Sequence, residues 1–492
     1  MSDPWTDRGP TPVYRAEPFA AQAEPDRLPS PSAGPERRRA FRRALVIVLV
    51  ITAAAGIARF WSLGRPAEKV FDEVYYASDA CLYAGHPFED CGLESAAERS
   101  WVHPPLGKWL IALGIDAFGN DPFGWRFTGA LVGTASVALA GAFAFLLWGR
   151  PLWAGVAALL LATEHLHLVQ SRVAMLDVFL AFFVLLGFTL LLWDRVRQKR
   201  LDALAAANEA APYLAPSGPR WIRVAAGASF AAATASKWSG IFAWLGGLVL
   251  AVMWERGRRA RAGVERPLLA ALRQEWASLA LAFVAAPLLV YFLSWVRWLG
   301  DHGWSLPRLW SNHLSMADYH LDLEPFSESG EPIHPYMSEA WTWLLLLRPV
   351  AYYYESMGDR AAEILGIGNP LLFWGALAFL PYLAYVWIRR RDWRAGAILV
   401  PVLVLYAPWL FVTRPLFLFY MVPVTPFLAL GATYALRDVS RVRGAGRPSL
   451  RLAAGVAVAV AVGLFVFFWP VLIGDPISKG AWDARIWFSG WI

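Results

Sequence analysis

Residues 37–63 decide how the chain is placed, and they read RRRAFRRALVIVLVITAAAGIARFWSL. Arginines stand immediately before a run of about twenty mostly apolar residues, which is long enough to cross the hydrocarbon core of a bilayer. Basic residues of this kind stay on the cytoplasmic side of a span. We therefore predict a first transmembrane helix over residues 44–63, running outward from a cytoplasmic N-terminus.

The residues before this helix have a different composition. Residues 1–36 are rich in Pro, Ala, Glu and Asp and show no apolar periodicity. Such a segment cannot bury enough apolar surface to offset the entropy lost on ordering. We predict a disordered cytoplasmic tail over residues 1–43, followed by one transmembrane domain over residues 44–492.

The composition of the whole chain is that of a polytopic membrane protein. Of its 492 residues, 57% are hydrophobic and 17% are charged, whereas soluble domains carry about 25% charged residues. The basic residues fall in short clusters between apolar blocks. The net charge of +7 therefore indicates cytoplasmic loops and not a nucleic-acid surface.

The apolar blocks predict an all-α fold with about eleven transmembrane helices. They lie near residues 44–63, 125–148, 152–169, 174–193, 221–235, 239–254, 276–298, 369–388, 395–412, 416–436 and 452–473. Every basic loop then falls on the cytoplasmic side, and the C-terminus lies outside. A missed span would invert all later loops, so this agreement tests the topology.

Two large loops face the outside in this topology, over residues 64–123 and 299–368. The first contains a short apolar helix near residues 109–118 and two adjacent carboxylates, Asp72 and Glu73. Paired carboxylates just outside a membrane can deprotonate a hydroxyl or hold a polar substrate. The alternative is an ordinary helix start, with Asp72 as the cap and Glu73 in the first turn.

The same loop holds both cysteines of the chain, Cys81 and Cys91. Outside the cytoplasm they could form a disulfide, and the alternative is two unrelated thiols. Their spacing does not indicate a metal site, because no histidine or second cysteine pair accompanies them.

Arg172, Lys237 and Arg414 each stand alone at the outer end of an apolar helix. A lone basic residue there could simply snorkel to the headgroups. Three at one depth beside a carboxylate pair favour binding to the phosphate of a lipid-linked substrate. Lys108 could contribute to the same site.

Further polar residues lie at similar depth. Asp177 lies inside the fourth span, where a carboxylate is costly unless paired, and Arg172 is a possible but not ideal partner. Glu164, His165 and His167, near the end of the third span, could line the same cavity or pair structurally. In the second outside loop, histidine and aromatic side chains are typical of sugar and peptide subsites. The alternative is an interfacial belt, which the tryptophans slightly favour.

Together these motifs resemble the protein O-mannosyltransferase family, and more narrowly its actinobacterial members. The resemblance extends from about residue 44 to the C-terminal Trp491-Ile492. The large soluble lumenal insert of the eukaryotic members is absent. The motifs are Asp72-Glu73, His103-Pro104-Pro105-Leu106-Gly107-Lys108, Arg172 to Asp177, Ser236-Lys237-Trp238, His334-Pro335-Tyr336 and Leu347-Arg348-Pro349.

The resemblance implies a GT-C membrane glycosyltransferase of the cytoplasmic membrane, with its active site facing outside. It would transfer mannose from polyprenyl-phosphate mannose to Ser or Thr of exported proteins. Asp72 would be the general base, and Glu73 would position the acceptor or the base. The donor phosphate would bind Arg172, Lys237, Arg414 and Lys108. The acceptor and sugar would bind His103, His334, Tyr336, Asp177 and Arg348.

We expect a single inverting displacement, because a retaining enzyme would need a second carboxylate as nucleophile. No cofactor or metal is required, although acidic pairs can bind divalent ions. The expected partners are the donor lipid, the acceptor protein and the bilayer, with the secretion translocon as a further candidate and no nucleic acid. One alternative is a GT-C transferase acting on a lipid or glycan. Another is a transporter or flippase, which would predict repeats and intramembrane charges along a path.

Overall fold

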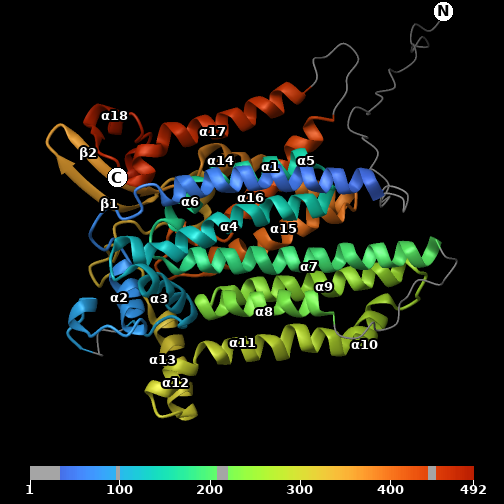
Figure 1. Ribbon diagram of the computed structural model, residues 1–492, viewed down its shortest axis with the longest axis horizontal. Helices are drawn as coiled ribbons and strands as arrows, with labels where there is room; N and C mark the ends of the chain where they lie inside the picture. Colours follow the sequence, from blue (N-terminus) through green and yellow to red (C-terminus); the bar gives the residue numbers. More distant parts are fainter. Residues whose placement is uncertain (1–33, 96–99, 208–219, 442–449) are drawn as a thin grey trace, which may run out of the picture.

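The computed structural model describes residues 34–95, 100–207, 220–441 and 450–492 (Figure 1). The predicted tail over residues 1–43 lies mostly outside these ranges. The prediction of disorder is wrong for residues 34–43, because they form the first turns of helix α1, which begins at Gly34. Their arginines are good helix formers and extend the apolar helix beyond the bilayer core.

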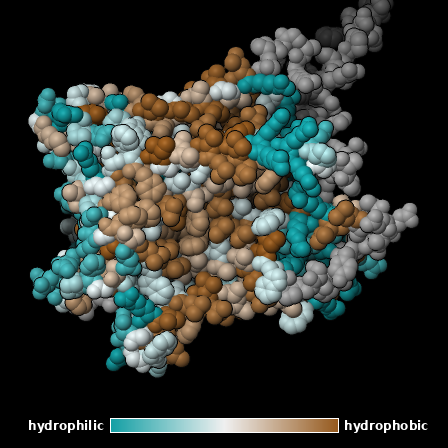
Figure 2. Space-filling model, viewed as in Figure 1, coloured by the Kyte–Doolittle hydropathy of each residue, from teal (hydrophilic) through white to brown (hydrophobic). Residues whose placement is uncertain are grey.

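Most helices run side by side along the long axis of the molecule (Figure 1). They are α1 (Gly34–Phe60), α4 (Pro122–Trp148), α5 (Pro151–Ala162), α7 (Leu176–Ala207), α8 (Trp221–Ser236), α9 (Gly240–Arg261), α10 (Pro267–Ala280), α11 (Ala286–Ser294), α14 (Pro370–Arg389), α15 (Trp393–Tyr406), α16 (Thr425–Val439) and α17 (Arg451–Ile473). The short α6 (His165–Ser171) follows α5 at an angle. A π-helical turn, η4 (Leu281–Ala285), joins α10 to α11. Figure 2 shows a broad hydrophobic band across this bundle, with hydrophilic residues at both ends.

Within the described ranges, seven helical segments are long and apolar enough to cross a membrane. An eighth is the pair α5 and α6, bent by 64° where Glu164 caps the second helix. Helices occupy every predicted position, but α8, α9 and α16 do not pass the same test of length and composition. The multi-span architecture is therefore confirmed, while the count of about eleven stays a prediction.

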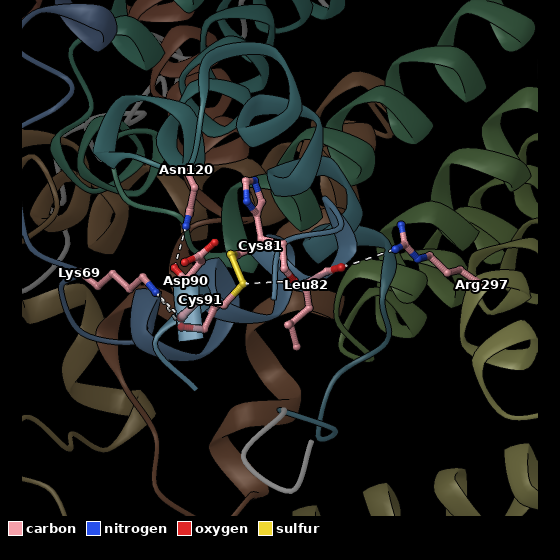
Figure 3. The surroundings of a disulfide bond; sticks show 9 residues. Lys69, Cys81, Leu82, Asp90, Cys91, Asn120 and Arg297 are labelled. Carbon is pink, nitrogen blue, oxygen red and sulfur yellow. Dashed lines mark hydrogen bonds between the residues drawn. A yellow bond between two sulfur atoms is a disulfide. The ribbon is translucent and has the colours of Figure 1, made fainter. Parts of the chain in front are cut away.

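The first large loop folds into α2 (Glu73–Tyr83), η2 (Glu89–Cys91) and α3 (Leu106–Phe118). The short helix expected near residues 109–118 is therefore present. A disulfide joins Cys81 to Cys91 and fastens η2 to α2 (Figure 3). Lys69 donates to the Cys91 carbonyl at 2.9 Å, and Asn120 donates to the Asp90 carbonyl at 2.9 Å. These bonds tie η2 to the two ends of the same loop.

The second large loop contains α12 (Val296–Asp301), α13 (Leu306–Asp322) and η5 (Ala340–Leu345). It also contains an antiparallel hairpin of β1 (Val350–Met357) and β2 (Arg360–Gly366), which follows η5 and adds a small sheet to the mostly helical fold. The short β3 (Ile477–Ser478) adds a third strand. Consecutive tyrosines favour a strand, and Gly358, with φ of 71°, supplies the turn.

Both loops, the sheet and the C-terminus gather at one end of the bundle, which we call the loop end (Figure 1). Four short elements complete it: η6 (Ala407–Phe411), η7 (Leu418–Met421), α18 (Lys479–Asp483) and η8 (Ser489–Trp491). The opposite end, the basic end, contains the last turn of α9 with Arg258, Arg259 and Arg261.

A buried ionic cluster ties helices together at the basic end. Arg220 pairs with Glu255 at 2.5 Å, and Arg223 pairs with Glu275 at 2.9 Å. Asp194 on α7 accepts hydrogen bonds from Arg220. Because every charge here has an opposite partner, the cluster fixes α7, α8, α9 and α10 relative to one another.

Candidate functional site

Asp72 stands at the loop end, immediately before α2. Its side chain makes no capping bond to the helix backbone, so the alternative of an ordinary cap is not what the structure shows. The Tyr76 hydroxyl donates to Asp72 Oδ2 at 3.3 Å. Burial raises the pKa of the Asp72 carboxyl to about 6; the Lys237 charge opposes this rise, and the Asp177 charge adds to it. Asp72 is thus a buried carboxylate with a raised pKa, and its role as a base stays a prediction.

The backbone just before Asp72 is strained. Phe71 has φ of 48°, a left-handed conformation that large side chains rarely adopt. Its ring is held by edge-on contacts with His334 at 5.6 Å and with Tyr352 at 5.2 Å between centroids. These contacts compensate the strain and fix the direction in which the next residue projects. His334, predicted from the second loop, therefore contacts the residue that precedes Asp72.

Glu73 has a different environment from its neighbour. Its side chain is fully buried, and Arg126 of α4 binds it through two hydrogen bonds of 2.8 and 2.7 Å. The backbone amides of Val70 and Ala174 donate to the same carboxylate at 3.0 and 2.8 Å. With both oxygens engaged, Glu73 holds the start of α2 against α4. This favours a role in positioning the base over contact with an acceptor.

Replacing Glu73 by Gln is expected to lower the free energy of unfolding by about 3–5 kcal/mol, because Arg126 would remain buried without its counter-charge. The melting temperature of the purified protein measures this. Glu68→Gln changes an exposed carboxylate in the same loop and should leave the melting temperature nearly unchanged. Equal melting temperatures for both variants would contradict the assigned role.

Lys237, at the break between α8 and α9, binds Asp177 at the start of α7. Its ammonium group lies 2.9 Å from each carboxylate oxygen. The same group lies over the ring of Tyr420, 4.6 Å from the centroid. Asp177 is therefore paired across helices with Lys237, and not with Arg172, which the sequence offered as a possible but not ideal partner. The charges of both Lys237 and Asp177 act on the Asp72 carboxyl, and that of Lys237 favours its ionised form.

Arg414 contacts the same tyrosine, Tyr420, as Lys237 does. It donates to the Tyr420 hydroxyl at 2.9 Å and contacts His320 Nδ1 at 2.7 Å. The His320 ring lies 5.4 Å from that of His103, which in turn lies 5.9 Å from Tyr76. Burial, and then neighbouring cations, lowers the pKa of His103 well below its usual value and that of His320 to about 4. Both imidazoles are neutral at physiological pH.

These contacts join residues from α2, α7, α13 and the breaks between helices into one group. We call it the carboxylate site; its members are Asp72, Tyr76, His103, Asp177, Lys237, His320, Arg414 and Tyr420. In the described part of the chain, no group of three or more His, Cys, Asp or Glu side chains is arranged to hold a metal ion. That the reaction requires no metal, although a divalent ion could bind, stays a prediction.

Two other predicted residues are engaged in contacts outside this group. Arg172 donates to the carbonyls of Arg59 at 2.8 Å and Trp61 at 2.7 Å, which closes the end of α1. Lys108 forms a buried pair with Asp79 at 2.6 Å. These contacts favour structural roles, and a donor-phosphate role for either residue stays a prediction.

The remaining predicted residues join the second loop to the C-terminus. Arg348 donates to the carbonyls of Pro335 at 2.8 Å and Gly490 at 2.9 Å, and its guanidinium lies over the Tyr336 ring. Tyr336 in turn lies 5.8 Å from the His334 ring. Arg348 thereby orders the segment that carries His334. These contacts account for the arginine without a direct contact to an acceptor.

Sequence reasoning did not find Arg126, Asp79, His320 or Tyr420. A signal existed for Arg126, because a fully buried Glu73 requires a cation and Arg126 stands nearly alone in an apolar helix. His320 and Tyr420 lie far from Asp72 in the sequence, and only the fold brings them together.

Similarity to solved structures identifies the fold. The chain superposes on a protein of the Saccharomyces cerevisiae Pmt1–Pmt2 protein O-mannosyltransferase complex bound to the sugar donor, with a TM-score of 0.71, 15% identity and coverage of 91% and 92% of the two chains. It also resembles ArnT from Cupriavidus metallidurans bound to undecaprenyl phosphate, with a TM-score of 0.55, 18% identity and coverage of 87% and 76%. The fold is therefore that of the GT-C membrane glycosyltransferases.

Sequence comparison narrows this class. Residues 118–296 match the family model of dolichyl-phosphate-mannose-protein mannosyltransferases, and residues 305–491 match the C-terminal four-span region of protein O-mannosyltransferases. A polyprenol-phosphate-mannose–protein mannosyltransferase of Mycobacterium tuberculosis is 32% identical over 91% of this chain and 92% of its own. One of Mycolicibacterium smegmatis is 31% identical over 94% and 95%. The chain belongs to the protein O-mannosyltransferase family.

Proposed function

We propose that this chain transfers mannose from polyprenyl-phosphate mannose to the hydroxyl groups of Ser and Thr in exported proteins. The names of the mycobacterial relatives support the donor and the protein acceptor. The observation that carries the chemistry is the carboxylate of Asp72, which does not cap its helix and lies within the electrostatic reach of Lys237. Arg414 joins the same group through Tyr420, which contacts both cations. A base and an anion site side by side are what this transfer requires.

In the proposed reaction, Asp72 accepts the proton of the acceptor hydroxyl, and the oxygen of that hydroxyl attacks the anomeric carbon of the mannose. The bond from that carbon to the phosphate oxygen breaks, and the polyprenyl phosphate leaves as an anion. Lys237 and Arg414 stabilise the charge that develops on the phosphate. A single displacement of this kind inverts the anomeric configuration. Glu73, anchored by Arg126, keeps Asp72 in position.

The experiment that tests the function is transfer of labelled mannose from polyprenyl-phosphate mannose to a Ser/Thr-rich peptide by the purified protein. The same peptide with Ala at the Ser and Thr positions and the soluble donor GDP-mannose are the controls, and neither should support transfer. Transfer to a lipid or glycan but to no peptide would instead identify another GT-C transferase. Movement of the intact donor lipid across the bilayer without transfer would identify a flippase.

Transfer is expected to rise as the pH increases through about 6 and to level off above that value. Burial raises the pKa of Asp72, so its carboxylate is protonated and inactive as a base below about 6. The rate constant kcat/KM should fall about tenfold for each pH unit below it. Weaker binding of the donor at low pH would also lower kcat/KM. Donor affinity measured over the same pH range separates the two effects. A rate that stays constant between about pH 5 and 7 would exclude a base with this pKa.

We also propose that the loop end faces outward from the cytoplasmic membrane. The arginine-rich last turn of α9 lies at the other end, and basic residues favour the cytoplasmic side. An outward site would meet acceptors as they emerge from the secretion translocon, which we propose as a partner. Cysteine introduced at exposed Trp341 should react with a membrane-impermeant thiol reagent in intact cells, whereas cysteine at exposed Arg261 should not.

A further inference from the structure

A groove lies near the basic end of the bundle, far along the helices from the carboxylate site. It is bounded by α5, the end of α16 and the start of α17, and its volume is about 690 Å³. That volume falls in the range of cavities that bind small molecules, about 300–1,000 Å³. The side chains of Leu152, Val156 and Leu436 and the α17 residues Ala454 and Val458 make its walls apolar.

The mouth of the groove is basic. Arg150 comes from the turn before α5, Arg441 follows α16, and Arg451 begins α17. No acidic side chain is among the described residues that line it. The groove therefore combines an apolar wall with a concentration of positive charge at one end.

We propose that this groove binds an anionic phospholipid of the adjacent leaflet. Its phosphate would lie among the three arginines, and an acyl chain would lie along the apolar walls. A soluble anion would leave those walls exposed, and a zwitterionic lipid would bring a cation toward the arginines. Trp153 lines the groove close to its mouth, at the depth where tryptophan favours the headgroup interface.

The packing of α17 gives the lipid a structural role. Only 28% of the apolar window of α17 is buried within the protein, against 72% for α7. α17 runs along the edge of the bundle (Figure 1), and a lipid in the groove would fill the space between it and α5. The proposal concerns a second site, and it does not depend on the proposed transfer reaction.

The charge requirement is tested by native mass spectrometry of the full chain in detergent, with added phosphatidylglycerol or phosphatidylcholine. The wild type should retain phosphatidylglycerol at least about tenfold better than phosphatidylcholine, since each basic residue favours an anionic headgroup. The triple variant Arg150→Gln, Arg441→Gln, Arg451→Gln should lose this preference. Equal retention of phosphatidylglycerol by the triple variant and the wild type would overturn the proposal.

The shape requirement is tested with two glycines of α17. A Cβ at Gly455 or at Gly463 meets no atom within 4 Å, so both positions accept a larger side chain, but only Gly455 lines the groove. Gly455→Trp should reduce phosphatidylglycerol retention about tenfold, and Gly463→Trp should leave it unchanged. Wild-type retention by Gly455→Trp would place the lipid elsewhere. Retention of polyprenyl phosphate but not phosphatidylglycerol at these residues would show that the occupant is not a phospholipid.

Discussion

Asp72→Asn is expected to lower mannose transfer at least about a hundredfold at neutral pH. Asparagine has nearly the same shape as aspartate, so the backbone at Phe71 and the position of α2 should be preserved. Its amide cannot accept the proton of the acceptor hydroxyl. The substitution also removes a negative charge near Asp177 and Lys237, so binding of the anionic donor should be maintained or strengthened. Transfer and donor binding are both measured on the purified protein.

Tyr76→Phe is the matched control for Asp72→Asn, because it removes only the hydroxyl that donates to the carboxylate at 3.3 Å. This long hydrogen bond should contribute little, and transfer should fall by less than about tenfold. If Asp72→Asn transfers mannose as fast as the wild type, Asp72 is structural and the base must be another group. If it binds no donor, its charge matters for binding and the assignment to proton transfer is wrong.

The span pattern could be predicted from the sequence because hydropathy and loop charge report directly on the bilayer. The hairpin of β1 and β2 could not, since its tyrosines equally suit an interfacial loop or a sugar subsite. One of its strands, β2, also pairs with β3, more than a hundred residues later in the chain. A short sheet of this kind depends on contacts that no local pattern contains.

The carboxylate pair illustrates why a motif gives the location of a site before it gives the roles. Asp72 and Glu73 are adjacent and chemically alike, yet one carboxylate lies beside Lys237 and the other is saturated by Arg126. Consecutive residues at a helix start project in different directions, so one faces the cavity and the other faces the bundle. The sequence locates the pair, but the helices packed around it determine the environment of each carboxylate.

The lone cations divide in the same way. A basic residue at a helix end can face a cavity, or it can turn back to bind the last carbonyls of a neighbouring helix. Arg172 does the second, whereas Lys237 binds the Asp177 carboxylate and Arg414 binds the Tyr420 hydroxyl. Their sequence contexts are alike, since each follows an apolar helix. The length of an arginine side chain lets it reach either partner, so the choice depends on which helix packs beside it.

Lys237→Met is expected to lower transfer at least about a hundredfold, because it removes a cation beside the breaking bond between sugar and phosphate. It also leaves Asp177 buried without its partner, which should lower stability. Loss of activity alone therefore does not separate a role in transfer from a role in neutralising Asp177. The double variant Lys237→Met, Asp177→Asn separates them, since it removes both members of the pair.

The double variant should regain most of the melting temperature lost in Lys237→Met, because no uncompensated charge remains in the protein. It should not regain transfer, and its affinity for the donor should stay low, because the phosphate would still lack its lysine. The opposite result is equally clear: transfer restored by the second substitution would mean that Lys237 serves only to balance Asp177. Arg414 would then be the cation that binds the phosphate, and its hydrogen bonds to His320 and Tyr420 would be the features that orient it.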